Sequence, residues 1–278
     1  MSLRGFPCGL VVGLALASSA SAQVNLPSLL NLHGDLAPVR YTPGALDRAA
    51  HVQARLEALA MDFSRWGSQP YVLQGYVLAP EDWAVAGLDR PYGLPERAGA
   101  RGVAVPAWGD DRSVALWRGL LHGQMPWGTD MPVRGTPEEA ASLSLADLVL
   151  QVESARIFVE GERLGGDAPW IGELVAHAVA HQAFASHEAG RLDEIAEVWT
   201  RLGGGNPDLA TCAASVGDPA TTLACDARFA AGASILFAED RMKTVRRLQK
   251  LAKKRGLSEA TLVKEYPRLA DWLADGRR

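Results

Sequence analysis

The chain has 278 residues, a formal net charge of −4 and 48% hydrophobic residues. This length is sufficient for a substantial buried core. The slight excess of acidic residues excludes the broad basic surface typical of nucleic-acid-binding proteins, so we expect no nucleic-acid partner.

Residues 1–22 have the pattern of a cleavable signal peptide. Arg4 supplies a positive charge, an apolar run extends from Gly9 to Ser19, and residues 20–22 have the small-x-small spacing that signal peptidase recognises. The run is shorter than the ~20 apolar residues that cross a bilayer, and no later segment is long enough, so we expect no membrane span. The pattern predicts export, either to the periplasm or out of the cell.

The next segments predict a small sheet preceded by one helix. A polar linker is expected at residues 23–46, and residues 47–66 have apolar side chains at helical spacing. Three short β-prone runs follow between Tyr71 and about Val133, at residues 71–79, 102–108 and, less regularly, 113–120.

From Gly135 onward nearly every segment has helical periodicity. Strands followed by a run of helices, without βαβ alternation, predict the α+β class.

The predicted helix from Leu145 to Glu160 carries an arginine on its apolar face. At about 100° per residue, Arg156 falls near the centre of the apolar arc and Glu153 lies at its edge. A guanidinium keeps its proton, so its burial requires a carboxylate partner. Glu153, three residues away, is one candidate, and Glu173 on the next predicted helix is a second.

That next helix carries Glu173, His177 and His181 at intervals of four residues. Side chains at this spacing lie on one face, so two of the three, with a residue from elsewhere, could bind a displaced metal ion. The alternative is a polar stripe in which the histidines form hydrogen bonds. Because no further ligand stands at a characteristic spacing, we expect no metal there and favour the hydrogen-bonding role.

The two helices together resemble the core of the gluzincin zinc metallopeptidases, over roughly residues 71–188. The order V-E-S-A-R, from Val152 to Arg156, followed by W-I-G-E, ending at Glu173, is similar to the H-E-x-x-H helix and the W-x-x-E helix of that family. The resemblance implies that Glu153 stands at the position of the general base and Glu173 at that of the third zinc ligand.

The resemblance implies a metallopeptidase-like α+β domain, expected at residues 47–200, with the active-site-type helix following the small sheet. The glycine-rich stretch from Arg201 to Asp208 indicates a soft boundary, after which a helical C-terminal subdomain is expected at residues 201–278.

Both histidine positions of the motif hold other residues. Val152 offers no ligand atom, and Arg156 is permanently cationic and repels zinc. Glu173 alone falls short of the three protein ligands that hold a catalytic zinc. We therefore expect a non-catalytic protein without a cofactor, in which an Arg156–Glu173 ion pair, with Glu153 nearby, replaces the metal.

Three functions follow from these patterns. The favoured one is a pseudoenzyme with a binding or structural role, whose partner is an extended peptide or protein added to an edge strand near Val103 to Trp108. A second is a hydrolase or peptidase with displaced zinc at Glu173, His177 and His181. A third is a helical interaction module, which requires that residues 71–133 form no sheet under the Val152 helix.

The C-terminal part of the sequence contains a pair of cysteines and a basic cluster. Cleavage of the signal would remove Cys8 and leave Cys212 and Cys225, and an even cysteine count in an oxidising compartment favours a disulfide between them. The basic cluster from Lys243 to Arg255 is predicted to form a helix with one apolar stripe. Its charged side is interpreted as a solvated face, with a membrane-surface or polyanion site as the alternative.

Overall fold

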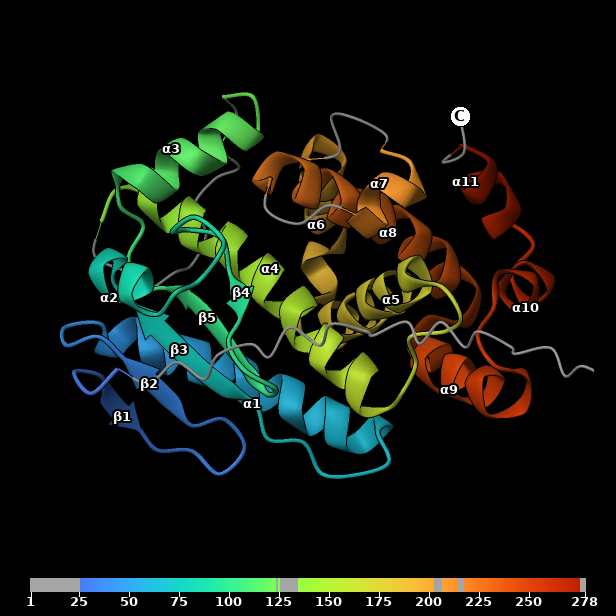
Figure 1. Ribbon diagram of the computed structural model, residues 1–278, viewed down its shortest axis with the longest axis horizontal. Coiled ribbons are helices and arrows are strands. Elements are labelled where there is room, and N and C mark those ends of the chain that lie inside the picture. The colour runs from blue at the N-terminus through green and yellow to red at the C-terminus, as the bar shows by residue number, and fades with distance from the viewer. Residues whose placement is uncertain (1–25, 124, 126–134, 203–206, 215–217, 276–278) are drawn as a thin grey trace, which may run out of the picture.

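The computed structural model describes residues 26–123, 125, 135–202, 207–214 and 218–275 (Figure 1). The predicted signal peptide lies outside these ranges. The described chain forms a small sheet at one side and a group of helices at the other, which confirms the α+β prediction.

The sheet has five strands in the order β1-β2-β3-β5-β4. Strands β2, β3 and β5 are parallel, whereas the two outer strands, β1 and β4, run antiparallel to their neighbours. Two of the predicted runs are confirmed, since they contain β3 and β5. The bounds are β1 Leu30–Leu32, β2 Val39–Tyr41, β3 Gln74–Leu78, β4 Glu96–Arg97 and β5 Gly102–Pro106.

Two predictions about the sheet are wrong. The expected linker at residues 23–46 supplies β1 and β2, each of three residues, which is too short for an alternating pattern to be visible in the sequence. The expected edge strand from Val103 to Trp108 contains β5, which lies between β3 and β4, so β4 is the outer strand on that side.

The run at residues 113–120 is also not a strand. It belongs to helix α3, Asp111–Leu120, because the carboxylate of Asp110 accepts a hydrogen bond from the backbone N–H of Ser113 and caps the helix. Val114 and Trp117 lie one helical turn apart and form the buried side of α3, which faces the core.

Helices α1, Leu46–Trp66, and α4, Pro137–Gly161, cover one face of the sheet. Alternate strand residues such as Val103 and Val105 join this core, whereas Ala104 points to the opposite face with the small helix α2, Pro80–Val85. A capping box of Thr136 and Glu139 fixes the start of α4.

A buried ion pair joins α1 to α4. Two guanidinium nitrogens of Arg48 lie 3.1 and 2.7 Å from the two carboxylate oxygens of Asp147, and both side chains are almost fully buried. Burial raises the pKa of Asp147, but Arg48 and Arg55 outweigh that effect and hold the pKa well below its usual value. The predicted first helix is therefore fixed to α4 by charge as well as by apolar packing.

The remaining helices form the second half of the molecule. Helix α5 lies between α4 and α8, and α8 also contacts α6 and α9. One continuous hydrophobic core extends from the sheet to residues near the C-terminus, across the expected boundary at residue 200. The bounds are α5 Pro169–His187, α6 Leu192–Leu202, α7 Leu209–Ala214, α8 Pro219–Asp240, α9 Thr244–Arg255, α10 Glu259–Glu265 and α11 Leu269–Asp275.

A disulfide joins α7 to α8. The Cα atoms of Cys212 and Cys225 are 5.4 Å apart, and the bond confirms the predicted pairing. Within the described ranges, no helix is both long and apolar enough to span a bilayer.

Candidate functional site

A buried ion cluster lies where α4, α5 and α8 meet, and Arg156 is at its centre. Its Nε donates to Glu173 of α5 at 2.8 Å, its Nη1 to Glu153 of α4 at 2.5 Å, and its Nη2 to Asp226 of α8 at 2.6 Å. The predicted Arg156–Glu173 ion pair, with Glu153 nearby, is present. One guanidinium thus links three helices through three carboxylates.

The neighbouring carboxylates keep Arg156 in its charged form. Burial alone would lower its pKa, but Glu153, Glu173 and Asp226 together raise the pKa well above the usual value. Donors on a planar fork can meet several carboxylates at once, which a lysine ammonium cannot reproduce. The arginine on the apolar arc of α4 is therefore explained by the partners that face it.

A second arginine, Arg90, completes the cluster. It lies in the segment before β4, and its Nη1 donates to Glu153 at 2.7 Å, so this carboxylate is held between two guanidinium groups. Sequence reasoning missed Arg90, because a loop residue has no periodicity that would point to its partner.

Asp226 was also missed, although the sequence carried a signal for it. It is an aspartate within a largely apolar stretch of α8, and it is almost fully buried. Burial raises its pKa, but Arg156 first, and then His177, bring the pKa well below the usual range, so the side chain is an anion. A buried acid in an apolar helix requires a cation, and that cation is Arg156.

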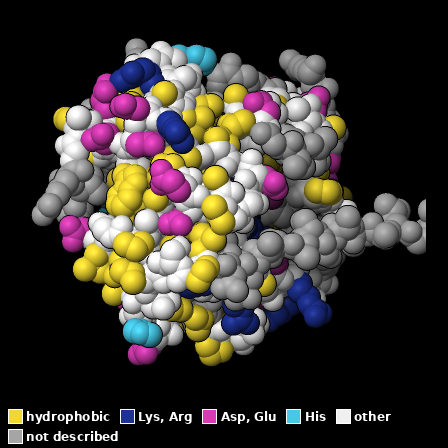
Figure 2. Space-filling model, turned by 60° about the vertical axis from the view of Figure 1, so that its left-hand side comes forward, with side chains coloured by type: hydrophobic (Ala, Val, Ile, Leu, Met, Phe, Trp, Pro, Cys, Tyr) yellow, Lys and Arg dark blue, Asp and Glu magenta, His cyan; other side chains and the backbone are white. Residues whose placement is uncertain are grey.

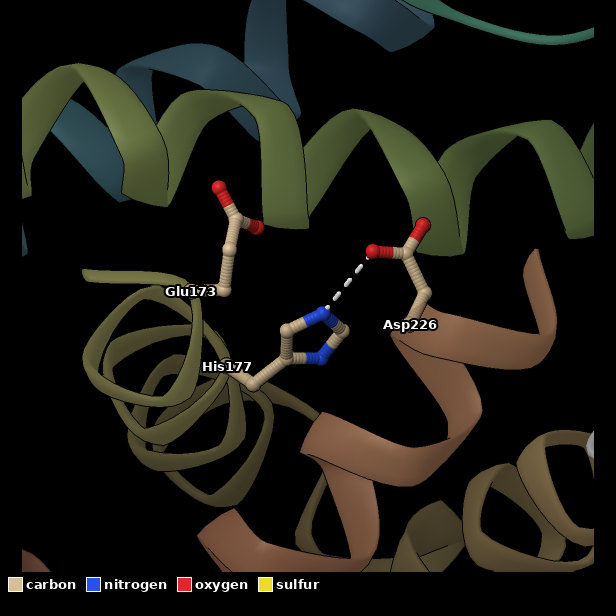
Figure 3. A group of neighbouring side chains, drawn as sticks. All are labelled: Glu173, His177 and Asp226. Carbon is tan, nitrogen blue, oxygen red and sulfur yellow. Dashed lines mark hydrogen bonds and ion pairs between the residues drawn. The ribbon is translucent and has the colours of Figure 1, made fainter. Parts of the chain in front are cut away.

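His177 takes part in the cluster through Asp226. Its Nε2 lies 3.1 Å from Asp226 Oδ1, and Figure 3 shows the imidazole turned toward Asp226, while the Glu173 carboxylate extends toward α4. The ring packs between Trp199 and Phe229, with centroid distances of 5.7 and 6.0 Å. The predicted hydrogen-bonding role of His177 is thus seen in the structure.

His181 lies apart from the cluster. Its ring packs against Phe237, with centroids 4.6 Å apart, and burial, followed by the proximity of His177, lowers its pKa. Among the described residues, the group whose ligand atoms all lie within 4.8 Å of one another is Glu173, His177 and Asp226. The histidine pair expected for a displaced metal is therefore not the set of residues that the fold brings together.

The cluster borders a cavity of about 260 Å³. Glu153 and Asp226 are buried in its wall, Arg90 and Arg156 are partly buried, and the side chain of Glu173, which is 36% exposed, connects the cluster to solvent. One oxygen of Asp226, Oδ2, has no hydrogen-bond partner among the described residues. Besides the charged residues, the cavity is lined by Trp170, Phe229, Thr222, Pro169 and the cysteines of the disulfide.

The residues present do not fit the zinc ion that the gluzincin resemblance implies. Val152 is buried and offers no ligand atom. Arg156 Nη2 lies within 2.7 Å of oxygens of both Glu173 and Asp226, so it occupies the space beside the carboxylates that a metal would need. A divalent ion bonded to these oxygens would face a guanidinium that cannot lose its proton.

Comparison with protein families, with curated proteins and with solved structures finds no match for this chain. The likeness to gluzincins therefore rests on the local pattern of Val152 to Arg156 and Trp170 to Glu173.

Replacing Arg156 with methionine tests the cluster. The variant leaves three carboxylates with one cation fewer, so we expect the free energy of unfolding to fall by about 3–5 kcal/mol, as when one partner of a buried ion pair is removed. Urea denaturation followed by circular dichroism measures the change. Arg118→Met is the matched control, because Arg118 pairs with Glu138 on the surface and its loss should cost less than about 1 kcal/mol. Equal stability of Arg156→Met and wild type would contradict the account.

The low pKa of Asp226 predicts a pH dependence. Its anion stabilises the fold above the pKa of the unfolded chain, near the ordinary value of 3.8, and this contribution is lost as pH falls toward the lower pKa of the folded state. The stability difference between wild type and Asp226→Asn should therefore be largest at neutral pH and shrink below pH 3.8. Urea unfolding of both proteins across this range measures it. A difference that stays constant with pH would show that Asp226 is not stabilised as an anion.

Proposed function

We propose that this chain is an exported, non-catalytic protein with a metallopeptidase-like domain, whose remaining cleft binds an extended peptide. The observation that carries the proposal is the position of Arg156. Its guanidinium bonds Glu153 and Glu173, the two residues that the resemblance assigns to general base and third zinc ligand. A cation fixed by the protein thus stands where the family would hold a metal ion.

Loss of catalysis follows from the chemistry of these groups. Glu153 would have to accept a proton from a metal-bound water, but it is held by Arg90 and Arg156 instead. Neither Val152 nor Arg156 can bind zinc, so nothing lowers the pKa of a water molecule at this place. Export is supported by the pattern of residues 1–22 and by the disulfide, a bond that persists in oxidising compartments.

Peptide binding is supported by the position of β4. It is the outer strand of the sheet, and its far edge pairs with no other described strand. Arg97 of β4 pairs with Glu160 of α4, and Arg90, just before this strand, reaches the ion cluster. A peptide added to this edge would therefore run beside the cavity. There its side chains could contact Trp170 as well as positively and negatively charged residues of the cavity wall.

A metal-dependent hydrolase with a displaced site is the second candidate. It is favoured by the closeness of the ligand atoms of Glu173, His177 and Asp226, and by the unpartnered Oδ2 of Asp226 in the described chain. It requires Arg156 to leave its three carboxylates. The helical-module alternative required no sheet at residues 71–133, whereas β3 and β5 lie in this region and β5 packs against α4.

Zinc titration separates the first two functions. We expect wild type to bind no stoichiometric zinc, and Val152→His/Arg156→His to bind one ion, because the two histidines and Glu173 would supply three ligands. Addition of Glu173→Gln to that double variant should abolish the gain. Calorimetry and metal analysis of the dialysed proteins provide the measurement. Stoichiometric zinc in wild type that is lost in His177→Ala and kept in His181→Ala would establish the displaced site.

Selection from an unbiased library of displayed peptides tests the binding role. Peptides enriched on wild type should bind Trp170→Ala at least about tenfold more weakly, because buried tryptophans dominate such interfaces. Trp108→Ala is the control, since Trp108 is exposed and lines a different cavity near the start of α4. Fluorescence anisotropy gives the affinities. If both variants bind the peptides as wild type does, this cleft is not the binding site.

A further inference from the structure

Helix α9 and the turn of Arg241–Lys243 before it concentrate positive charge on a chain that is otherwise acidic. The 15 residues from Arg241 to Arg255 contain eight of the chain's 28 Lys and Arg residues and no Asp or Glu. The chain as a whole nevertheless has a formal charge of −4. Figure 2, which brings the side of α2 and α3 forward, shows acidic and apolar side chains intermixed on that face.

The cations of α9 share one face. Val245, Leu248 and Leu251 are buried in the core and fix the orientation of the helix. At 100° per residue, the exposed cations opposite them fall within an arc of about 120°, along a helix roughly 18 Å long. We call this set the basic face, and it comprises Arg246, Arg247, Lys250, Lys253 and Lys254 of α9, together with Lys243, which directly precedes the helix.

Further charges lie near α9 but outside the basic face. Arg255, at the end of α9, and Arg163, in the turn after α4, are both exposed and line a shallow hollow with Ala252, on the side of α9 that faces the core. Carboxylates also lie close by, since Glu265 pairs with Arg247, Asp167 lines the hollow, and Glu239 and Asp240 directly precede Arg241. They offset only part of the positive charge.

We propose that the basic face of α9 binds the anionic headgroups of a phospholipid membrane surface. A planar layer of phosphates can meet a row of cations on one side of a surface helix, and each Lys or Arg near such a surface contributes about 1 kcal/mol. Met242, 47% exposed at the start of this region, provides an apolar side chain that can enter the interface. The site does not depend on the peptide-binding cleft.

A nucleic acid or glycan chain fits the same face less well. Proteins that follow single-stranded polymers combine a basic groove with aromatic side chains on which bases or sugars stack. The segment from Arg241 to Arg255 contains no Phe, Tyr or Trp, and its cations lie on a convex helix surface.

Vesicle binding of the full protein tests the proposal. Sedimentation with phosphatidylglycerol–phosphatidylcholine vesicles should show binding at low ionic strength that weakens with added salt, and no binding to pure phosphatidylcholine. Lys250→Gln/Lys253→Gln/Lys254→Gln should reduce the affinity roughly 100-fold. The matched control is Arg101→Gln/Arg112→Gln/Arg118→Gln, which removes the same number of exposed cations elsewhere and should leave the affinity nearly unchanged.

Each contrary result has a defined meaning. Equal losses in the two triple variants would show attraction by overall charge and would overturn the assignment to α9. Wild-type binding that does not depend on the anionic lipid would also overturn it. Binding of a heparin fragment at an ionic strength where vesicles do not bind would identify a polyanion as the partner and exclude the membrane surface.

Discussion

The guanidinium of Arg156 is the constraint on which the site depends. Because it cannot lose its proton, a position on the apolar face of α4 is tolerable only if carboxylates meet it. Glu153, Glu173 and Asp226 do so from α4, α5 and α8. Glu153 and Asp226 are buried acids that would be costly without a cation, so loss of Arg156 would destabilise the whole cluster.

Helix α4 holds Arg156 in place because several other interactions fix the position of the helix. A capping box sets its start, the Arg48–Asp147 pair joins it to α1, and its apolar side chains pack on β5. The outer strand β4 is linked to the same helix by Arg97 and Glu160. The cavity beside the ion cluster is therefore bordered by side chains that the protein itself holds in place. This cavity is the feature on which the proposed binding role rests.

The sequence could predict those features that depend on local pattern. The arginine on the apolar arc stands out on a helical wheel, and its need for a carboxylate, together with the resemblance to the gluzincin motif, predicts Glu173 as a partner. Arg90 and Asp226 could not be assigned, because their contacts depend on how β4 and α8 pack against α4. The three-residue strands β1 and β2 cannot be recognised in the sequence, because pairing with neighbouring strands, and not local periodicity, determines them. In α3 the cap at Asp110 outweighed the β-prone composition.

We propose that the fixed cation of Arg156 occupies the place of a metal ion in this site. A crystal structure of the wild-type protein grown with excess zinc tests this proposal. We expect the guanidinium to keep its hydrogen bonds to Glu153, Glu173 and Asp226, with no zinc among them. A zinc ion bound by Glu173, His177 and Asp226, with Arg156 displaced, would show that the proposal is wrong.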